Sequence, residues 1–191
     1  MSHVAILYFS GFGNTHLLAM AVEQGVNEGG AKAKLHRIEG KDIVEGRYKN
    51  EAVFADLAKA DGILFGSPTY MGGPAAQFKA VADASGGVWM SQGWKNKLAG
   101  GFTHSGSLSG DKLSTLQYFA VLAAQHGMTW INPAELSDPK TGINRLGSFS
   151  GVMGQTAPTF GQKPPELDEG DRQTGILFGK RFAQLVAKYA K

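Results

Sequence analysis

Apolar runs alternate along the chain with segments of helical periodicity. Four continuous runs and one alternating segment predict strands, at residues 3–10, 33–39, 62–67, 98–106 and 128–133. Apolar positions spaced three or four residues apart predict the helices between and after them, at residues 18–26, 51–60, 75–85, 113–123 and 171–190. Strands that alternate with helices indicate a parallel sheet covered by helices on both faces.

Five strand–helix units suit a flavodoxin-like three-layer α/β sandwich, in which a five-stranded parallel sheet has the order 2-1-3-4-5. The periodicity also permits the six-stranded dinucleotide-binding fold. A length of 191 residues predicts a single domain spanning 1–191. Residues 134–170 show no period, and a loop of this length is usually functional or part of an interface. We expect it to meet a neighbouring subunit.

The composition is that of an ordinary globular protein, with 42% hydrophobic and 18% charged residues. The chain has no cysteine, which excludes disulfides, thiolate metal sites and a cysteine nucleophile. Its first apolar run is too short for a signal peptide or a membrane span, so we expect a cytoplasmic protein without a membrane partner. The net charge is +3 with dispersed basic residues, which gives no patch for nucleic acid.

The first predicted strand ends in the sequence SGFGNTH, residues 10–16, just before a predicted helix. In open parallel sheets, ligands bind beyond the carboxyl ends of the strands. Gly11 and Gly13 allow the backbone to curl around an anion, while Ser10, Thr15 and the amides at the start of the helix supply donors for a phosphate. The alternative is a simple glycine turn that caps the helix through Asn14 or Thr15.

Other phosphate-binding and catalytic motifs are absent from the sequence. It contains no G-x-x-x-x-G-K-[ST] string, and His16 stands where the dinucleotide fingerprint requires a third glycine. The five histidines show no metal-ligand spacing, and neither H-E-x-x-H nor G-x-S-x-G occurs. The sequence therefore supports neither a metal site nor a hydrolase.

Two further loops leave the carboxyl ends of predicted strands. SPTYMGG, residues 67–73, offers backbone amides and flat side chains that suit the wall of a flavin ring. THSGSLSG, residues 103–110, offers hydroxyls and amides for the pyrimidine edge of such a ring. The alternatives are an ordinary strand-to-helix turn and a helix cap at Ser109 or Asp111. His126 ends a predicted helix, where capping is its default role.

Five segments in this order resemble the WrbA-type NAD(P)H:quinone oxidoreductases of the flavodoxin-like superfamily. They are VAILYFSGFGNT, ADGILFGSPTYMGG, GGVWMSQGWKNKLAGGFTHSGSLSG, LAAQHGM and the glycine-rich loop before the last helix. The resemblance covers nearly the whole chain. It implies an FMN-dependent oxidoreductase that transfers two electrons as hydride from NAD(P)H to quinones by a ping-pong mechanism.

The resemblance also assigns residues to the cofactor. The FMN phosphate would be held by Ser10, Phe12, Gly13, Asn14 and Thr15. The isoalloxazine would be bordered by Pro68, Thr69, Tyr70, Met71, Gly72 and Gly73, and its outer edge by Thr103, Ser105, Gly106 and Ser107. His126 would lie near the ring. No catalytic side chain is implied, because the flavin carries the chemistry.

Trp89 matches a family tryptophan that reaches over the flavin from a neighbouring subunit of a tetramer, which implies a homodimer or homotetramer. Tyr70-Met71 stands where the family often has Arg-Phe, and INP stands where it has a tyrosine after the fifth strand; both departures bear on nicotinamide and quinone preference. One alternative is a flavodoxin-type electron carrier without its own turnover. Such carriers are usually acidic, whereas the pI of this chain is about 9.1. Another is a non-catalytic domain with an empty flavin site.

Overall fold

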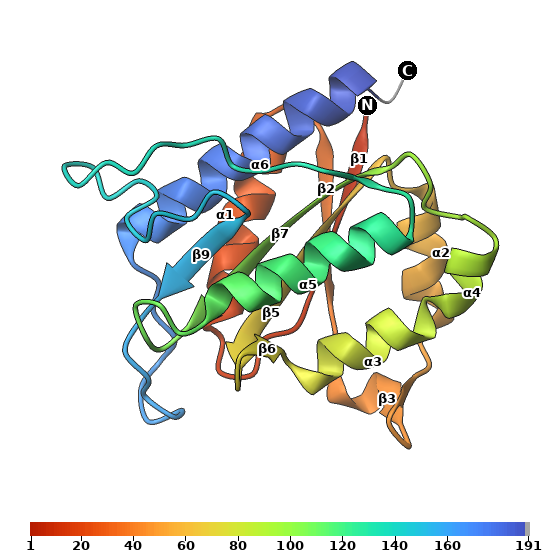
Figure 1. The fold of residues 1–191 in the computed structure, drawn as a ribbon, viewed down its shortest axis with the longest axis horizontal. Coiled ribbons are helices and arrows are strands. Elements are labelled where there is room, and N and C mark those ends of the chain that lie inside the picture. The colour runs from red at the N-terminus through yellow and green to blue at the C-terminus, as the bar shows by residue number, and fades with distance from the viewer. Residues whose placement is uncertain (190–191) are drawn as a thin grey trace.

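A computed structural model describes residues 1–189 and shows a mainly parallel sheet between two layers of helices (Figure 1). Its central path runs in the spatial order β2 (Lys32–Arg37), β1 (His3–Tyr8), β5 (Gly62–Tyr70), β7 (Leu98–Ser105) and β8 (Thr129–Trp130). Numbered along the chain, these five strands follow the expected order 2-1-3-4-5. The chain therefore has the flavodoxin-like arrangement and not the six-stranded dinucleotide order.

The sheet is larger than the five strands expected, because it contains seven. β9 (Val152–Gln155) pairs parallel to the carboxyl half of β7, and β6 (Gly73–Pro74) pairs antiparallel to the end of β5. The fifth strand, expected at 128–133, has only two residues in β8. Pro133 has no amide hydrogen and Ala134 has a φ of +61°, so the chain leaves the sheet and β9 continues the edge about 20 residues later.

The helices confirm the expected alternation, with small differences at their ends. They are α1 (Asn14–Glu28), α2 (Glu51–Lys59), α3 (Ala76–Ala84), α4 (Gly86–Met90), α5 (Lys112–Gln125) and α6 (Glu169–Tyr189). A short 3-10 turn (Gly40–Asp42) and a separate hairpin of β3 (Ile43–Val44) and β4 (Arg47–Tyr48) follow β2. Among the described residues, no helix is both long and apolar enough to cross a membrane.

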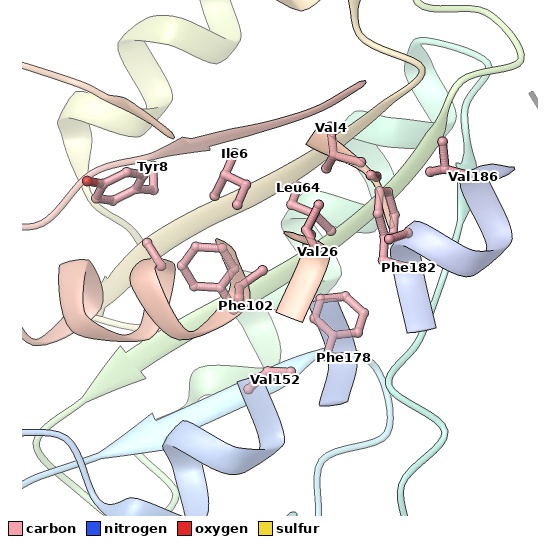
Figure 2. Packing of buried hydrophobic residues seen from close by; sticks show 14 of the residues in the cluster. Val4, Ile6, Tyr8, Val26, Leu64, Phe102, Val152, Phe178, Phe182 and Val186 are labelled. Atoms are coloured by element: carbon pink, nitrogen blue, oxygen red, sulfur yellow. The ribbon is translucent and has the colours of Figure 1, made fainter. Parts of the chain in front are cut away.

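Two hydrophobic cores hold the helices on the sheet. On one face α1 and α6 lie side by side, and Val26, Phe178 and Phe182 pack on side chains of β1, β5 and β7 (Figure 2). On the other face α2, α3 and α5 cover a cluster that contains Phe65, Phe78, Phe119 and Trp94. Strands buried on both faces explain why most strand segments are continuously apolar.

Glycine brings α1 and α6 unusually close together. A Cβ atom added at Gly25 would overlap the carbonyl oxygen of Ile176, and one added at Gly179 would overlap that of Val22. Gly25 and Gly179 thus allow the backbones of α1 and α6 to touch each other. This contact fixes α1, whose first turn forms part of the site described next.

Candidate functional site

A cleft opens where β1, β5 and β7 end at the same edge of the sheet. Its walls come from the three loops expected from the sequence and from the segment after β9, with an enclosed volume of about 150 Å³. The lining residues are Gly11, Phe12, Asn14, Thr15, Pro68, Thr69, Tyr70, His104, Ser105, Gly106, Thr156, Ala157, Pro158, Thr159 and Phe160. The loops thus converge at one place, as the position of ligands in open parallel sheets predicts.

The loop after β1 is held in shape by the buried hydroxyl of Ser10. Its Oγ accepts hydrogen bonds from the amides of Gly13 at 3.2 Å and His16 at 3.1 Å. Arg37 donates from Nη2 to the carbonyl oxygen of Ser10 at 3.1 Å. Gly13 has a φ of +97°, a conformation that side chains disfavour. Ser10 Oγ accepts two bonds, and its own hydrogen has no acceptor among the described residues. Ser10 is buried, and neither Ser10 nor Gly13 lines the cleft in this structure.

The first turn of α1 leaves backbone amides available to an anion. The N-cap residue, Gly13, has no side chain to cap this helix. Ser10 Oγ takes the amide of His16, but the amides of Asn14 and Thr15 donate to no acceptor in the described part of the chain. The simple capping role for Asn14 or Thr15 is therefore not what the structure shows. Free amides at a helix N-terminus, together with the helix dipole, form a phosphate-binding arrangement.

The loop after β5 is anchored by a chain of buried threonines. Thr69 Oγ1 lies 2.8 Å from Thr103 Oγ1 and 2.7 Å from Thr115 Oγ1, which joins β5, β7 and α5. Thr103 is fully buried by these contacts and does not line the cleft. The hydroxyl of Tyr70 lies over Gly11, 2.5 Å from the position that a Cβ atom there would take. Tyr70 thus covers the first loop, and a bulkier residue at position 11 would collide with it.

Residues at the tips of these loops lie at the border of the cleft. Met71 is fully exposed, and both Met71 and Gly72 have positive φ values in the turn between β5 and β6. Gly73 belongs to β6, and the exposed Ser107 follows the two lining residues Ser105 and Gly106. None of these four tip residues, 71–73 and 107, lines the cleft in this structure.

Two parts of the cleft were not predicted from the sequence, namely His104 and the segment 156–160 that follows β9. His104 Nε2 lies 2.9 Å from Thr156 Oγ1, and the Asn14 side chain donates to the same Thr156 oxygen at 2.9 Å. Asn14 also donates to the carbonyl oxygen of Glu166 at 2.8 Å. These contacts fold the aperiodic segment back over the start of α1. The only sequence signal for His104 was its place between Thr103 and Ser105 on the strand, where alternate side chains face opposite sides.

His104 is uncharged at neutral pH in this environment. Burial, and to a smaller extent the nearby cations Lys112 and Arg145, lowers the pKa of the imidazole to about 4. The lining residues include no carboxylate and no lysine or arginine. The cleft thus offers an anion neutral donors and a helix N-terminus, without a repelling charge.

Trp89 and His126 do not reach this cleft within one chain. They line a separate groove of about 610 Å³ between α4 and the end of α5. His126 is buried, with its Nε2 atom 2.9 Å from Ser85 Oγ and its ring 4.3 Å from that of Trp94. It lies near the amino end of β7, where the amide of Asn96 donates to the carbonyl oxygen of Gly127, whereas the cleft lies at the carboxyl end of that strand. Burial lowers the pKa of His126, so it does not act as a cationic helix cap.

The donor set of the cleft fits FMN, although the cleft is narrow. An uncharged pocket with exposed amides suits the phosphate, and hydroxyls of Thr15, Ser105 and Thr156 suit a polyol chain. A volume of about 150 Å³ is below the roughly 300–1,000 Å³ typical of cofactor pockets. The flat ring therefore requires Tyr70 to turn away from Gly11, and Tyr70 is partly exposed and free of side-chain hydrogen bonds in the described chain.

Comparisons with known proteins identify the family. Residues 5–142 match the family model described as NADPH-dependent FMN reductase. Flavodoxin FldP of Pseudomonas aeruginosa is 36% identical over 190 residues, which is 97% of each chain. An NAD(P)H dehydrogenase (quinone) of Geobacter sulfurreducens is 32% identical over 202 residues, or 97% of this chain and 98% of the relative.

A solved structure extends the agreement to three dimensions. The crystal structure of the flavodoxin, WrbA-like protein from Agrobacterium tumefaciens is 40% identical, has a TM-score of 0.77 and covers 99% of both chains. Sequence and fold thus agree over nearly the full length. These matches show that the chain belongs to the NADPH-dependent FMN reductase family, among its WrbA-like flavodoxin-fold members.

Proposed function

We propose that this chain is an FMN-dependent oxidoreductase that transfers two electrons from NAD(P)H to quinones. The observation that carries the proposal is the convergence of three strand-end loops on a cleft with free helix amides and no carboxylate. Relatives that align over nearly the whole chain are named NAD(P)H dehydrogenase (quinone), which supports the donor and the acceptor. The proposal needs no acid, base or nucleophile from the protein.

We assign the cofactor contacts from the geometry of the loops. The hydroxyl of Ser10 and the amides between Phe12 and Thr15 hold the phosphate of FMN. Residues 68–70 border the ring, and Ser105 with Gly106 lies along its outer edge. Bound FMN supplies the two-electron redox chemistry, while the protein orients it and excludes water from one face.

Nicotinamide and quinone are proposed to use the same exposed face in turn, as a ping-pong mechanism requires. Phe12, Tyr70, Met71 and Phe160 are exposed apolar side chains of the loops that surround the opening. A flat apolar rim of this kind suits both substrates, which are planar rings. The departure from the family at Tyr70-Met71 lies in this rim, so these two residues are where substrate preference is set.

Steady-state turnover tests the enzyme proposal. FMN-loaded protein is mixed with NADPH or NADH and benzoquinone, and the oxidation of the nicotinamide is followed by absorbance. We expect a rate well above that of an equal concentration of free FMN, and saturation by both substrates with parallel double-reciprocal lines. A rate no faster than free FMN contradicts the proposal.

The protein is further proposed to form a homodimer or homotetramer through the groove of Trp89 and His126. Trp89 is 50% exposed and Met90 is 79% exposed, on adjacent positions of α4. Exposed large apolar residues beside a groove are typical of a subunit interface. In such an assembly a neighbour can supply Trp89 to a cleft that one chain leaves open, and the part of the loop 134–170 outside the cleft can meet that neighbour. Because NAD(P)H is an intracellular reductant, a cytoplasmic location is part of the same proposal.

A second function is favoured by one relative. Flavodoxin FldP of Pseudomonas aeruginosa is 36% identical over 97% of both chains, and its name denotes an electron carrier. The chain would then accept electrons from a partner flavoprotein and show no turnover with NAD(P)H alone. Reduction of the bound flavin by a reductase, but not by NAD(P)H and quinone, distinguishes this function from the enzyme.

A further inference from the structure

Lys112 is a lysine whose side chain is completely buried, at the first position of α5. Its Nζ atom donates to Ser105 Oγ at 3.1 Å, to the carbonyl oxygen of Ser107 at 2.7 Å and to that of Leu108 at 3.0 Å. All three acceptors are uncharged. Among the described residues, no carboxylate lies within 4 Å of the ammonium group, although burial of an unpaired charge is costly.

The acidic side chain that acts on Lys112, Asp171, is already committed to other partners. Asp171 accepts two hydrogen bonds from Arg145, at 2.9 and 2.7 Å, and a third from the amide of Gln155 at 2.8 Å. The pKa of Lys112 is lowered to about 8, mainly because the side chain is buried. In this balance the charge of Asp171 raises the pKa and the charge of Arg145 lowers it. His104, which also faces Lys112, is neutral. The ammonium is therefore largely protonated at pH 7 and is not neutralised by a direct partner.

The ammonium group of Lys112 contacts the cleft through the side chain of Ser105. Ser105 lines the cleft and accepts a hydrogen bond from Lys112. The bond of its own hydroxyl to the carbonyl oxygen of Ser107 is 3.3 Å long and therefore weak. A hydroxyl polarised by an ammonium on one side is a stronger donor on the other. Ser105 thus presents this donor where the electron-accepting edge of FMN is proposed to lie.

We propose that Lys112 is a positioning residue that orders the loop 105–108 and makes the cleft bind reduced FMN more tightly than oxidised FMN. Uptake of two electrons and one proton from NAD(P)H adds one negative charge to the flavin. A buried cation behind Ser105 stabilises that added charge in a medium of low dielectric constant. The inference rests on the proposed seating of FMN in the cleft.

The Lys112→Met variant tests the proposal, because methionine keeps much of the side-chain length and removes the charge. The dissociation constant of oxidised FMN is measured by quenching of flavin fluorescence, and the midpoint potential of bound FMN by dye equilibration. The difference from the potential of free FMN then gives the dissociation constant of reduced FMN. We expect the ratio of oxidised to reduced dissociation constants to fall about ten-fold, which equals a drop of about 30 mV for a two-electron couple.

Lys97→Met is the matched control. The Lys97 ammonium also donates to backbone carbonyl oxygens, those of Ala58 and Ala60, and burial also lowers its pKa. It precedes β7 at the end of the sheet opposite the cleft. This variant leaves the ratio unchanged, although it lowers the stability of the fold.

The pH profile of the wild-type protein gives a second readout. The pKa of Lys112 is about 8 in the protein without FMN, and the negative charge of reduced FMN raises it above its value with oxidised FMN. Between the two values, reduction takes up one additional proton, so the midpoint potential falls by an extra ~30 mV per pH unit. Lys112→Met lacks this steeper segment.

The outcomes separate the inference from the proposed function. If Lys112→Met weakens both redox forms of FMN equally and keeps the pH profile, Lys112 is only structural and the inference is wrong. If wild-type protein binds no FMN in either form, the proposed seating fails and the inference fails with it. Should the methionine variant not fold, Ser105→Ala keeps the lysine and cuts its link to the cleft. We expect it to shift the midpoint potential in the same direction, and an unshifted value refutes the inference.

Discussion

Ser10→Ala is the perturbation that separates the shape of the first loop from its affinity for phosphate. In the structure the buried Ser10 hydroxyl accepts the amides of Gly13 and His16, and its hydrogen has no acceptor in the part of the chain that the structure describes. Alanine leaves both amides without this acceptor. Each net hydrogen bond contributes about 0.5–1.5 kcal/mol, so the free energy of unfolding without FMN should fall by about 1–3 kcal/mol.

The same substitution removes a hydroxyl donor to the FMN phosphate. A hydrogen bond to a charged group contributes about 1.5–3 kcal/mol, which corresponds to a roughly 10- to 150-fold weaker dissociation constant. Stability is measured by urea unfolding of the protein without FMN, and affinity by quenching of flavin fluorescence. Riboflavin, which lacks the phosphate, provides the comparison ligand, and its affinity should change much less than that of FMN.

Ser148→Ala is the matched control for this experiment. Ser148 is also buried, and its hydroxyl donates to the carbonyl oxygen of Gly151 at 2.6 Å, away from the cleft. We expect it to lower the free energy of unfolding by about 1 kcal/mol and to leave FMN affinity unchanged. The reasoning is refuted if Ser10→Ala weakens FMN and riboflavin equally, or if it weakens FMN no more than Ser148→Ala does.

Three further predictions concern packing, pH and assembly. Gly25→Ala should lower the free energy of unfolding by about 3 kcal/mol or more, because its Cβ meets the backbone of α6. Gly86→Ala has open space around it and should leave the free energy of unfolding, measured with urea, unchanged. The pKa of His104 is about 4 in the folded chain and ordinarily 6.5, so the unfolded chain takes up a proton as pH falls through 6.5 while the folded chain does not. The free energy of unfolding should therefore fall by on the order of 3 kcal/mol between pH 6.5 and pH 4, and His104→Gln should remove most of this part of its pH dependence. Trp89→Ala should shift the sedimentation coefficient toward that of a single chain; an unchanged assembly would exclude Trp89 from the interface.

The sequence predicted the elements whose identity depends on local pattern. The apolar runs of β1, β5 and β7 are buried on both faces, so their burial is visible in the sequence itself. β9 was not predicted because four residues carry little pattern, and its pairing with β7 depends on the chain leaving the sheet at Pro133. Local sequence patterns thus predicted the order of the five main strands. The division of the sheet edge between β8 and β9 depends on tertiary contacts and was not predictable.

The site shows the same division. Residues of the three strand-end loops were predictable because a parallel sheet brings its carboxyl ends together. The wall formed by residues 156–160 was not, because it is held by distant contacts such as Asn14 to Glu166 and Arg145 to Asp171. The assignment of His126 to the ring came from the family resemblance alone. In one chain it is buried at the other end of β7, outside the cleft.

A crystal structure of the protein with FMN tests the central claim most directly, which is that the start of α1 binds the phosphate. We predict phosphate oxygens within hydrogen-bond distance of Ser10 Oγ and of backbone amides between residues 12 and 15, with Tyr70 turned away from Gly11. A phosphate bound elsewhere, with Tyr70 still over Gly11 and the amides of α1 facing solvent, would contradict the account.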